Sequence, residues 1–173
     1  MPTTFSPSLK LTLMADGGNT GTWGGITNTN LGTLLEQAIT GVITINMGDA
    51  SYTLTNYNGL SDEARNAVLV VGGTNSGVRQ IIAPLVNKTY IVTNNTTGGY
   101  AITIGGSSGV VATVPNGSSV LVYCDGVNFY SGISGSAGNF SVAGNETVNG
   151  NLTVAGTTTL TGDATAPTQT AGN

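Results

Sequence analysis

The segment between residues 138 and 162 repeats with a period of six, and this period limits what it can fold into. Glycine closes each unit, at Gly138, Gly144, Gly150, Gly156 and Gly162, and the residue two places earlier is aliphatic, at Val142, Val148, Val154 and Leu160. Such a period fits neither a helix nor a long flat strand, but it suits short β segments that turn at a glycine. The repeat predicts a narrow β stalk over residues 135–162, followed by a flexible segment at 163–173.

One chain has too few apolar residues to hold this stalk together. The interior candidates are Phe140, Val142, Val148, Leu152, Val154 and Leu160, and their burial cannot offset the conformational entropy lost on ordering the repeat. A left-handed β-helix also uses hexads, but it needs three for every turn over several turns. Identical chains winding around one axis would add strands and pair their backbone groups. We therefore expect self-association through these residues, with a flexible Gly/Thr linker as the alternative.

Charged residues are scarce, which restricts the possible partners. They make up 7% of the chain, against about 25% in typical soluble domains. Disorder is not indicated, because 39% of the residues are hydrophobic. With a net charge of −4 and four scattered basic residues, the chain has no basic patch for nucleic acid, so we expect no nucleic-acid partner.

The sequence also bears on the compartment. The N-terminus lacks the basic region and apolar run of a signal peptide, and no stretch is long and apolar enough for a membrane span. We expect synthesis in a cytoplasm and no membrane insertion. Cys124 is the single cysteine, so no disulfide can form within the chain.

Residues 1–25 predict an extended N-terminal arm. Two prolines oppose an early helix, and residues 16–21 have the composition of turns. We expect this arm to dock on a partner through Phe5, Leu9, Leu11, Leu13 and Trp23. Trp23 stands alone among glycines, and two roles are open for it: a plug in a partner's pocket or a lid on its own domain's core.

The middle of the chain predicts one helix and then a β domain. Residues 26–41 favour an amphipathic helix with Leu31, Leu34, Leu35, Ala38 and Ile39 on one stripe. Residues 42–134 contain eight or nine short apolar runs separated by turn residues, which predicts a β-sandwich or barrel-like domain. The run 61–65 interrupts the series and indicates a capped helical turn on the surface. The fold class is therefore mainly β.

The residues that usually carry chemistry are missing or badly placed. The chain has no histidine, which removes the commonest general base and nitrogen ligand. Cys124 alternates with valines on a strand and is expected to be a buried small residue. Asp62 and Glu63 are adjacent carboxylates, whereas a glycosidase pair faces across a cleft. We expect no enzyme activity, no metal and no cofactor.

Several motifs, in this order, resemble the tail fibre proteins of tailed bacteriophages. Residues 21–24 (Gly-Thr-Trp-Gly), 27–31 and 35–41 resemble the N-terminal region of these proteins, and the stretches 89–100, 114–117 and 122–126 resemble the β domain that follows. The glycine hexads and residues 162–172 are similar to the start of the fibre shaft. The resemblance spans nearly the whole chain, although each motif alone is only moderately specific.

The resemblance implies a homotrimer that belongs to the tail of a virion. Its N-terminal arm would attach to a tail adaptor, hub or nozzle protein, and its distal part would project towards the host, where surface glycans are possible partners. The six hexad residues given above would then form the trimer core. The resemblance brings no catalytic residues. Two alternatives stay open: a head or capsid fibre with the same parts, and a fragment of a polysaccharide-degrading tailspike.

Overall fold

The computed structural model describes residues 4–132, 151 and 153–157. The chain separates into two compact units, residues 1–135 and 136–173. All the helices and strands described below belong to the first unit. It is rich in strands and contains one short helix, as the sequence predicts, while most of the predicted stalk lies outside the described residues.

The helix begins earlier than the sequence indicates. It consists of α1 (Trp23–Thr29), a π-helical segment η1 (Asn30–Leu35) and α2 (Glu36–Thr40). The predicted boundary at residue 26 is therefore wrong, because Trp23 is helical and does not belong to the extended arm. Gly41 leaves the helix in an extended conformation, with φ −65° and ψ 132°, and the chain continues directly into the first strand of the β domain.

The π-helical segment changes which leucines face inward. A π-helix has a wider turn than an α-helix, so the angles between successive side chains shift along η1. Leu34 is fully buried, whereas Leu31 and Ile39 are 57% and 66% exposed. The single stripe predicted for residues 31–39 is thus split, and part of it faces solvent.

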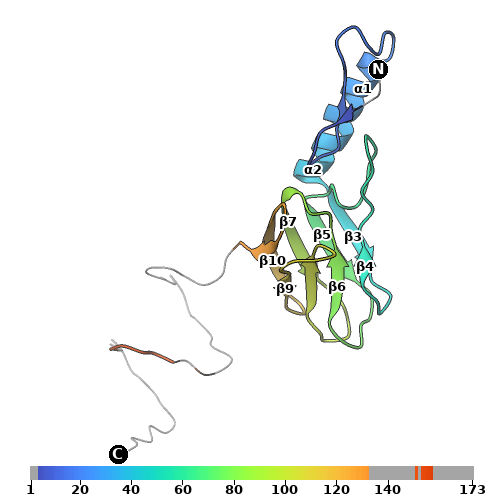
Figure 1. The fold of residues 1–173 in the computed structure, drawn as a ribbon. Helices are drawn as coiled ribbons and strands as arrows, with labels where there is room; N and C mark the ends of the chain where they lie inside the picture. The colour runs from blue at the N-terminus through green and yellow to red at the C-terminus, as the bar shows by residue number, and fades with distance from the viewer. Residues whose placement is uncertain (1–3, 133–150, 152, 158–173) are drawn as a thin grey trace, which may run out of the picture. The chain divides into compact units, whose positions relative to one another are not determined.

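Two sheets form the β domain (Figure 1). The five-stranded sheet has the order β11-β10-β7-β5-β3 and the four-stranded sheet the order β4-β6-β8-β9. The strands are β3 (Val42–Asn46), β4 (Tyr52–Thr53), β5 (Val68–Gly72), β6 (Arg79–Ile82), β7 (Asn87–Asn94), β8 (Ile102–Gly105), β9 (Ala112–Val114), β10 (Ser119–Asp125) and β11 (Phe129–Ser131). Each overlaps a run that the sequence predicts to be a strand.

The chain passes back and forth between the two sheets. From β3 to β8, successive strands alternate between the sheets, so that β3, β5 and β7 pair in parallel in one, and β4, β6 and β8 in the other. Antiparallel pairing begins only with β9, β10 and β11. The turn at residues 115–118 connects β9 to β10 in the opposite sheet, so it is a crossing between sheets, whereas the turn after Asp125 closes a hairpin.

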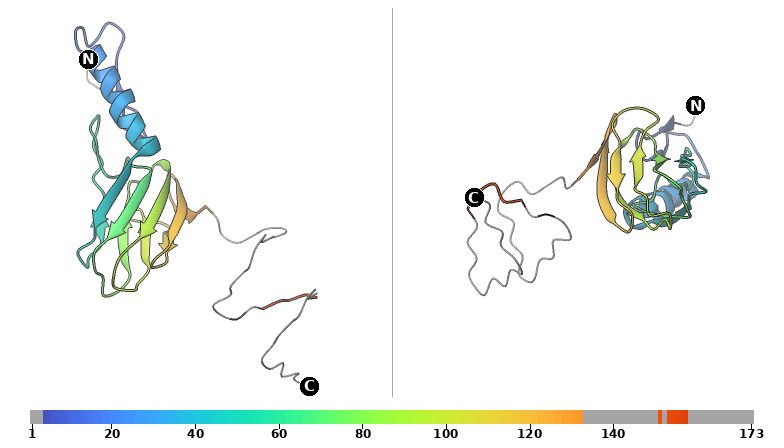
Figure 2. Two further views of the ribbon diagram at one scale, coloured as in Figure 1. Left: turned by 180° about the vertical axis from the view of Figure 1, so that it is seen from behind. Right: turned by 90° about the horizontal axis from the view of Figure 1, so that it is seen from below.

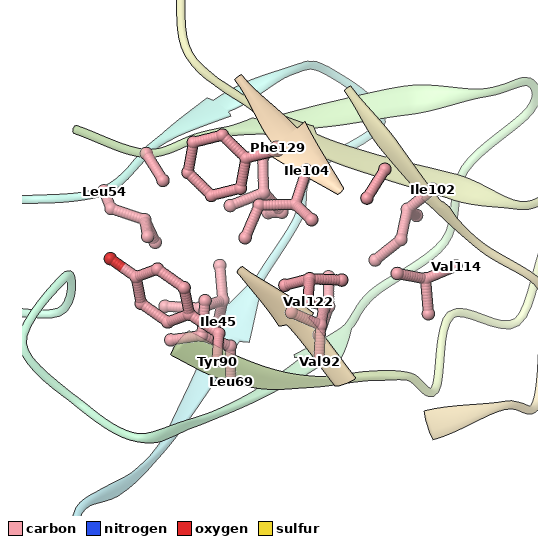
Figure 3. Packing of buried hydrophobic residues seen from close by; sticks show 14 of the residues in the cluster. Ile45, Leu54, Leu69, Tyr90, Val92, Ile102, Ile104, Val114, Val122 and Phe129 are labelled. Atoms are coloured by element: carbon pink, nitrogen blue, oxygen red, sulfur yellow. The ribbon is translucent and has the colours of Figure 1, made fainter. Parts of the chain in front are cut away.

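Alternating side chains of both sheets fill one apolar core (Figure 3). Tyr90 and Phe129 are its largest members, and their ring centroids lie 6.3 Å apart in a stacked arrangement. The hydroxyl of Tyr90 donates to the carbonyl of Ala64 at 2.9 Å, which satisfies its polar end. Cys124 is 3% exposed and belongs to this core, as its alternation predicts.

Residues 63–65 form a turn capped by Asp62, as predicted, but Asp62 and Arg65 are buried, so its predicted placement on the surface is wrong. Asp62 and Arg65 are 6% and 3% exposed, and their side chains form an ion pair at 3.0 Å. Asp62 also accepts hydrogen bonds from the backbone N–H groups of Arg65 and Tyr57, at 2.7 and 2.8 Å. Buried charges are tolerated when they are paired and hydrogen-bonded in this way.

We expect the buried pair to be worth far more than an exposed one. Replacing Arg65 by Met (Arg65→Met) leaves the Asp62 carboxylate without its counter-ion and should lower the free energy of unfolding by about 3 kcal/mol or more. The matched control is Arg79→Met, which removes the partner of Asp49 in an exposed pair of the same 3.0 Å length. Urea denaturation should show little change for the control; equal losses in both variants would contradict this view.

Candidate docking site

The N-terminal arm is a small β-hairpin rather than a free extended chain. Strands β1 (Thr4–Phe5) and β2 (Thr12–Leu13) pair antiparallel. The backbone N–H of Ser6 donates to the carbonyl of Leu11 at 2.9 Å, and the Ser6 hydroxyl accepts from the Leu11 N–H at 2.9 Å. The arm therefore has hydrogen-bonded structure of its own.

This hairpin is held on the helix and on the loop at residues 54–66. The Asn30 side chain of η1 accepts from the backbone N–H of Thr12 at 3.1 Å and donates to its carbonyl at 2.8 Å. The N–H of Gly59 donates to the carbonyl of Lys10 at 2.8 Å. A methyl group added at Gly59 would lie 2.7 Å from the Thr12 hydroxyl and 3.1 Å from the Phe5 ring. Hairpin, helix and loop are thus closely packed.

The closed end of the hairpin reaches the buried ion pair. Ser8 and Leu9 line a small cavity together with Asp62, Arg65 and Lys88, and its volume of about 10 Å³ is that of a single water site. The Nε atom of Arg65 is buried without a hydrogen-bond partner among the described residues. The Lys88 ammonium lies 4.5 Å from the Tyr90 ring centroid. Burial, and next the neighbouring Arg65 charge, lower the pKa of Lys88 to about 8.

The predicted docking residues divide into two groups. Phe5, Leu9 and Leu11 are half-buried, which fits a hairpin packed on its own chain. Leu13 and Trp23 are 48% and 63% exposed. The first three contribute to anchoring the arm, and the other two are available to a partner.

Trp23 does not cover the core of its own domain. It is the first residue of α1, and α1 lies at the end of the helix away from the sheets (Figure 1). Its side chain is not part of the core cluster. The sequence left two roles open for Trp23. A lid on the core of its own chain is excluded, so the remaining role is a plug in a partner's pocket.

Further exposed apolar side chains accompany Trp23. Met14, next to Leu13 in the chain, is 40% exposed, and Leu31 on the same helix is 57% exposed. Asp16 is the one charged residue between positions 11 and 35. We call Leu13, Met14, Trp23 and Leu31 the exposed apolar set. Sequence reasoning missed Met14, which sits beside the turn residues at 16–21, and assigned Leu31 to the buried stripe.

The predicted hexad core is almost entirely outside the described residues. Phe140, Val142, Val148, Leu152 and Leu160 cannot be placed. Val154 is described, and it is 48% exposed in the single chain. Its burial by other copies stays a prediction.

The described residues offer little for catalysis or metal binding. They contain no group of three or more His, Cys, Asp or Glu side chains that could hold a metal ion. Asp62 and Glu63 are both engaged: Glu63 accepts from the Tyr52 hydroxyl at 2.7 Å and from the Thr55 N–H at 2.8 Å. A groove of about 360 Å³ beside Leu54, Ile82 and Leu85 is lined mainly by apolar atoms. In the same part of the chain, no helix is long and apolar enough to cross a membrane.

Comparisons with known protein families, with curated proteins and with solved structures find no match for this chain. A proposal about function therefore rests on two things: the geometry of the described residues and the resemblance found in the sequence.

The contact at Gly59 gives a test of how the arm is anchored. In Gly59→Ala the new methyl group would meet Thr12 and Phe5, and the positive φ of +66° would be strained. We expect trypsin to cleave after Lys10 several times faster, because the hairpin would detach more often. Gly99→Ala is the matched control, since it has a similar φ of +78° and no neighbour within 4 Å. Equal cleavage rates in the two variants would show that strain alone, and not the contact, matters.

The environment of Lys88 predicts a pH dependence of stability. Below pH 8 both folded and unfolded chains hold the Lys88 proton. Between about pH 8 and 10 the folded chain releases it while the unfolded chain keeps it, so the free energy of unfolding should rise with pH, by on the order of 1 kcal/mol after allowance for solvent screening. Above pH 10 the trend should reverse, because burial raises the pKa of Tyr90 and its phenol stays neutral only in the folded chain.

Lys88→Met is the control for this pH dependence. It should remove the rise between pH 8 and 10 in urea denaturation while keeping the apolar stem of the side chain. An identical pH profile in the variant and the parent chain would contradict the assignment to Lys88.

Proposed function

We propose that this chain is the tail-proximal part of a bacteriophage tail fibre, a structural protein of the virion tail that is made in the host cytoplasm. It acts as a homotrimer, docks on a tail adaptor, hub or nozzle protein through its N-terminal end, and carries a shaft towards the host surface and its glycans. The observation that carries the proposal is the exposed apolar set, which lies on a helix and hairpin that are anchored on the β domain, with Trp23 at the end of the helix away from the sheets.

Anchoring at one end and exposure at the other is what a docking element requires. The base is fixed by the Thr12–Asn30 and Gly59–Lys10 hydrogen bonds, so little conformational entropy is lost when the distal end binds. Tryptophan is the residue most often found among those that dominate protein interfaces. An exposed Trp23 on a rigid helix therefore supports an anchor that enters a pocket of the tail protein.

The order of the parts also supports a fibre. A docking element comes first, a β domain follows, and the glycine hexads come last. This order suits a protein that attaches at one end and projects at the other. The resemblance to tail fibres follows the same order. The absence of histidine and the engagement of Asp62 and Glu63 in hydrogen bonds support a structural role over that of a tailspike enzyme.

Trp23→Ala tests the docking role. Because Trp23 is exposed, the variant should melt at nearly the same temperature as the parent chain. Incorporation into particles, measured by immunoblotting of purified virions made with the variant as their sole source of this protein, should fall sharply. Loss of an interface anchor of about 2 kcal/mol weakens binding roughly thirtyfold.

Val110→Ala is the matched control, since Val110 is 52% exposed in the loop before β9. It should leave both melting and incorporation unchanged. Normal incorporation of Trp23→Ala would argue against docking through the helix. Incorporation into heads that lack tails would favour the head-fibre alternative.

A further inference from the structure

The outer face of the five-stranded sheet carries an uninterrupted apolar row. Val42 on β3 lies opposite Val68 on β5, which lies opposite Ile91 on β7, which lies opposite Leu121 on β10. Val42, Ile91 and Leu121 are 64%, 43% and 40% exposed, and Val68 is half-buried. These residues alternate with the core residues of the same strands, so they point away from the core.

The rows beside it are uncharged as well. One consists of Thr44, Val70, Thr93 and Ser119, and the other contains Thr89, Tyr123 and Tyr130. The rings of Tyr123 and Tyr130 lie 5.3 Å apart. In the view from behind in Figure 2, no helix or strand of the described residues crosses this face. We call the three rows the uncharged sheet face.

The other sheet shows what a solvent-facing surface of this domain looks like. On its outer side Gln80 lies opposite Thr103, which lies opposite Thr113. This central row is polar, as expected where a sheet is half-buried with one face in water. Since both sheets belong to one domain, the apolar row on only one of them indicates that this face is covered in the working assembly.

We propose that the uncharged sheet face is the surface through which copies of this chain contact one another, at a site separate from the hexads. The inference rests on the proposed homotrimer and places its contact. The three rows carry no charge, and the nearest charge on this side of β10 is Asp125, which lies opposite Asn87 in the row beyond Tyr123. The three rows are suited to a second copy of themselves, because they neither repel their counterparts nor leave a buried ion unpaired.

The chain connections favour other copies over a different protein. The helix enters this sheet through its edge strand β3, and residues 133 onward leave through the opposite edge strand β11. If the sheets of several copies face one axis, the hexads that follow β11 start near one another in all of them. Ile39, 66% exposed just before Val42, would extend the contact onto the helix.

The size of the face fits a shared interface. Five strands about 4.8 Å apart, which are three to eight residues long at about 3.3 Å for each residue, give a face of roughly 400 Å². A patch of this size is among the largest that monomers expose and is often functional. It is about half of what each partner buries in a standard stable complex, so the helix and the hexads would supply the remainder.

A paired substitution in the full chain tests the inference. Ile91→Lys with Leu121→Glu places opposite charges on directly opposed residues, so that the sheet of one copy keeps a favourable cross-strand pair. Covering these charges with another copy would require desolvating them. Light scattering over a range of concentrations should show that the dissociation constant of the oligomer rises roughly tenfold or more.

The matched control places the same pair on the other sheet. Thr103→Lys with Thr113→Glu also substitutes directly opposed residues, and it should leave the dissociation constant unchanged. Circular dichroism of both double variants checks that the sheets remain folded. Equal weakening by both pairs would overturn the inference.

Further outcomes separate this inference from the proposed function. A parent chain that is monomeric at all concentrations would overturn both the homotrimer and the interface. An oligomer that resists Ile91→Lys/Leu121→Glu but dissociates in Val148→Asp/Val154→Asp would overturn the interface alone and leave the fibre proposal standing.

Labelling distinguishes other copies from the chain's own C-terminal segment. The thiol introduced by Ile91→Cys should react slowly with maleimide in the oligomer and faster on dilution to monomers, whereas that of Thr103→Cys should not change. Slow labelling of Ile91→Cys that persists in the monomer would mean that the chain covers its own face, and would overturn the proposal.

Discussion

The buried ion pair between Asp62 and Arg65 is the interaction on which the first unit depends. Its loop, residues 54–66, joins three parts of the structure: Gly59 bonds to the hairpin, Ser61 bonds to Gln37 of the helix at 2.9 Å, and Ala64 accepts from Tyr90 in the core. An irregular loop in such a place must satisfy its backbone groups without a strand partner. Arg65 does part of this by donating to the carbonyls of Tyr57 and Leu60, both at 3.0 Å. In a chain with so few charges, this ion pair stabilises the loop that holds the hairpin and the helix on the β domain.

The winding between two sheets explains why the two outer faces can differ. From β3 to β8 each winding of the chain contributes one strand to each sheet, so the two sheets are built from different segments and can differ in composition. The central outward row of the four-stranded sheet consists of Gln and Thr, whereas that of the five-stranded sheet consists of Val, Ile and Leu. The helix and the residues after β11 are both connected to the five-stranded sheet. The sheet with the apolar outer row is thus also the sheet that is connected to the helix and to the residues after β11.

In the proposed function the chain would have to hold a fixed orientation between its docking end and its shaft, and the connection of the helix to β3 bears on this. The helix runs into β3 through Gly41, where a Cβ atom would collide with the carbonyl of Gln37 and lie 2.5 Å from the Asn66 side chain. The Gly41 N–H donates to the Gln37 carbonyl at 2.9 Å and the Gly41 carbonyl accepts from the Val68 N–H at 3.0 Å, and these two bonds restrain the junction. At the far end of the helix Trp23 is exposed, so its apolar surface is available to a partner.

The sequence by itself determined the strands and the existence of a helix, because alternation and turn residues are local signals that survive without knowledge of neighbours. It also predicted that Cys124 lies in the core, because alternation places it on the same face as Val122. Only the tertiary structure decided which strands pair, and in parallel, since alternation specifies a face but not a partner. It also decided that Asp62 and Arg65 are buried and that Trp23 is exposed. In the π-helical segment it decided that Leu34 is buried while Leu31 faces solvent. These outcomes depend on contacts between residues far apart in sequence. Such contacts stabilise a buried charge or a change of helical register, and a local sequence pattern does not predict them.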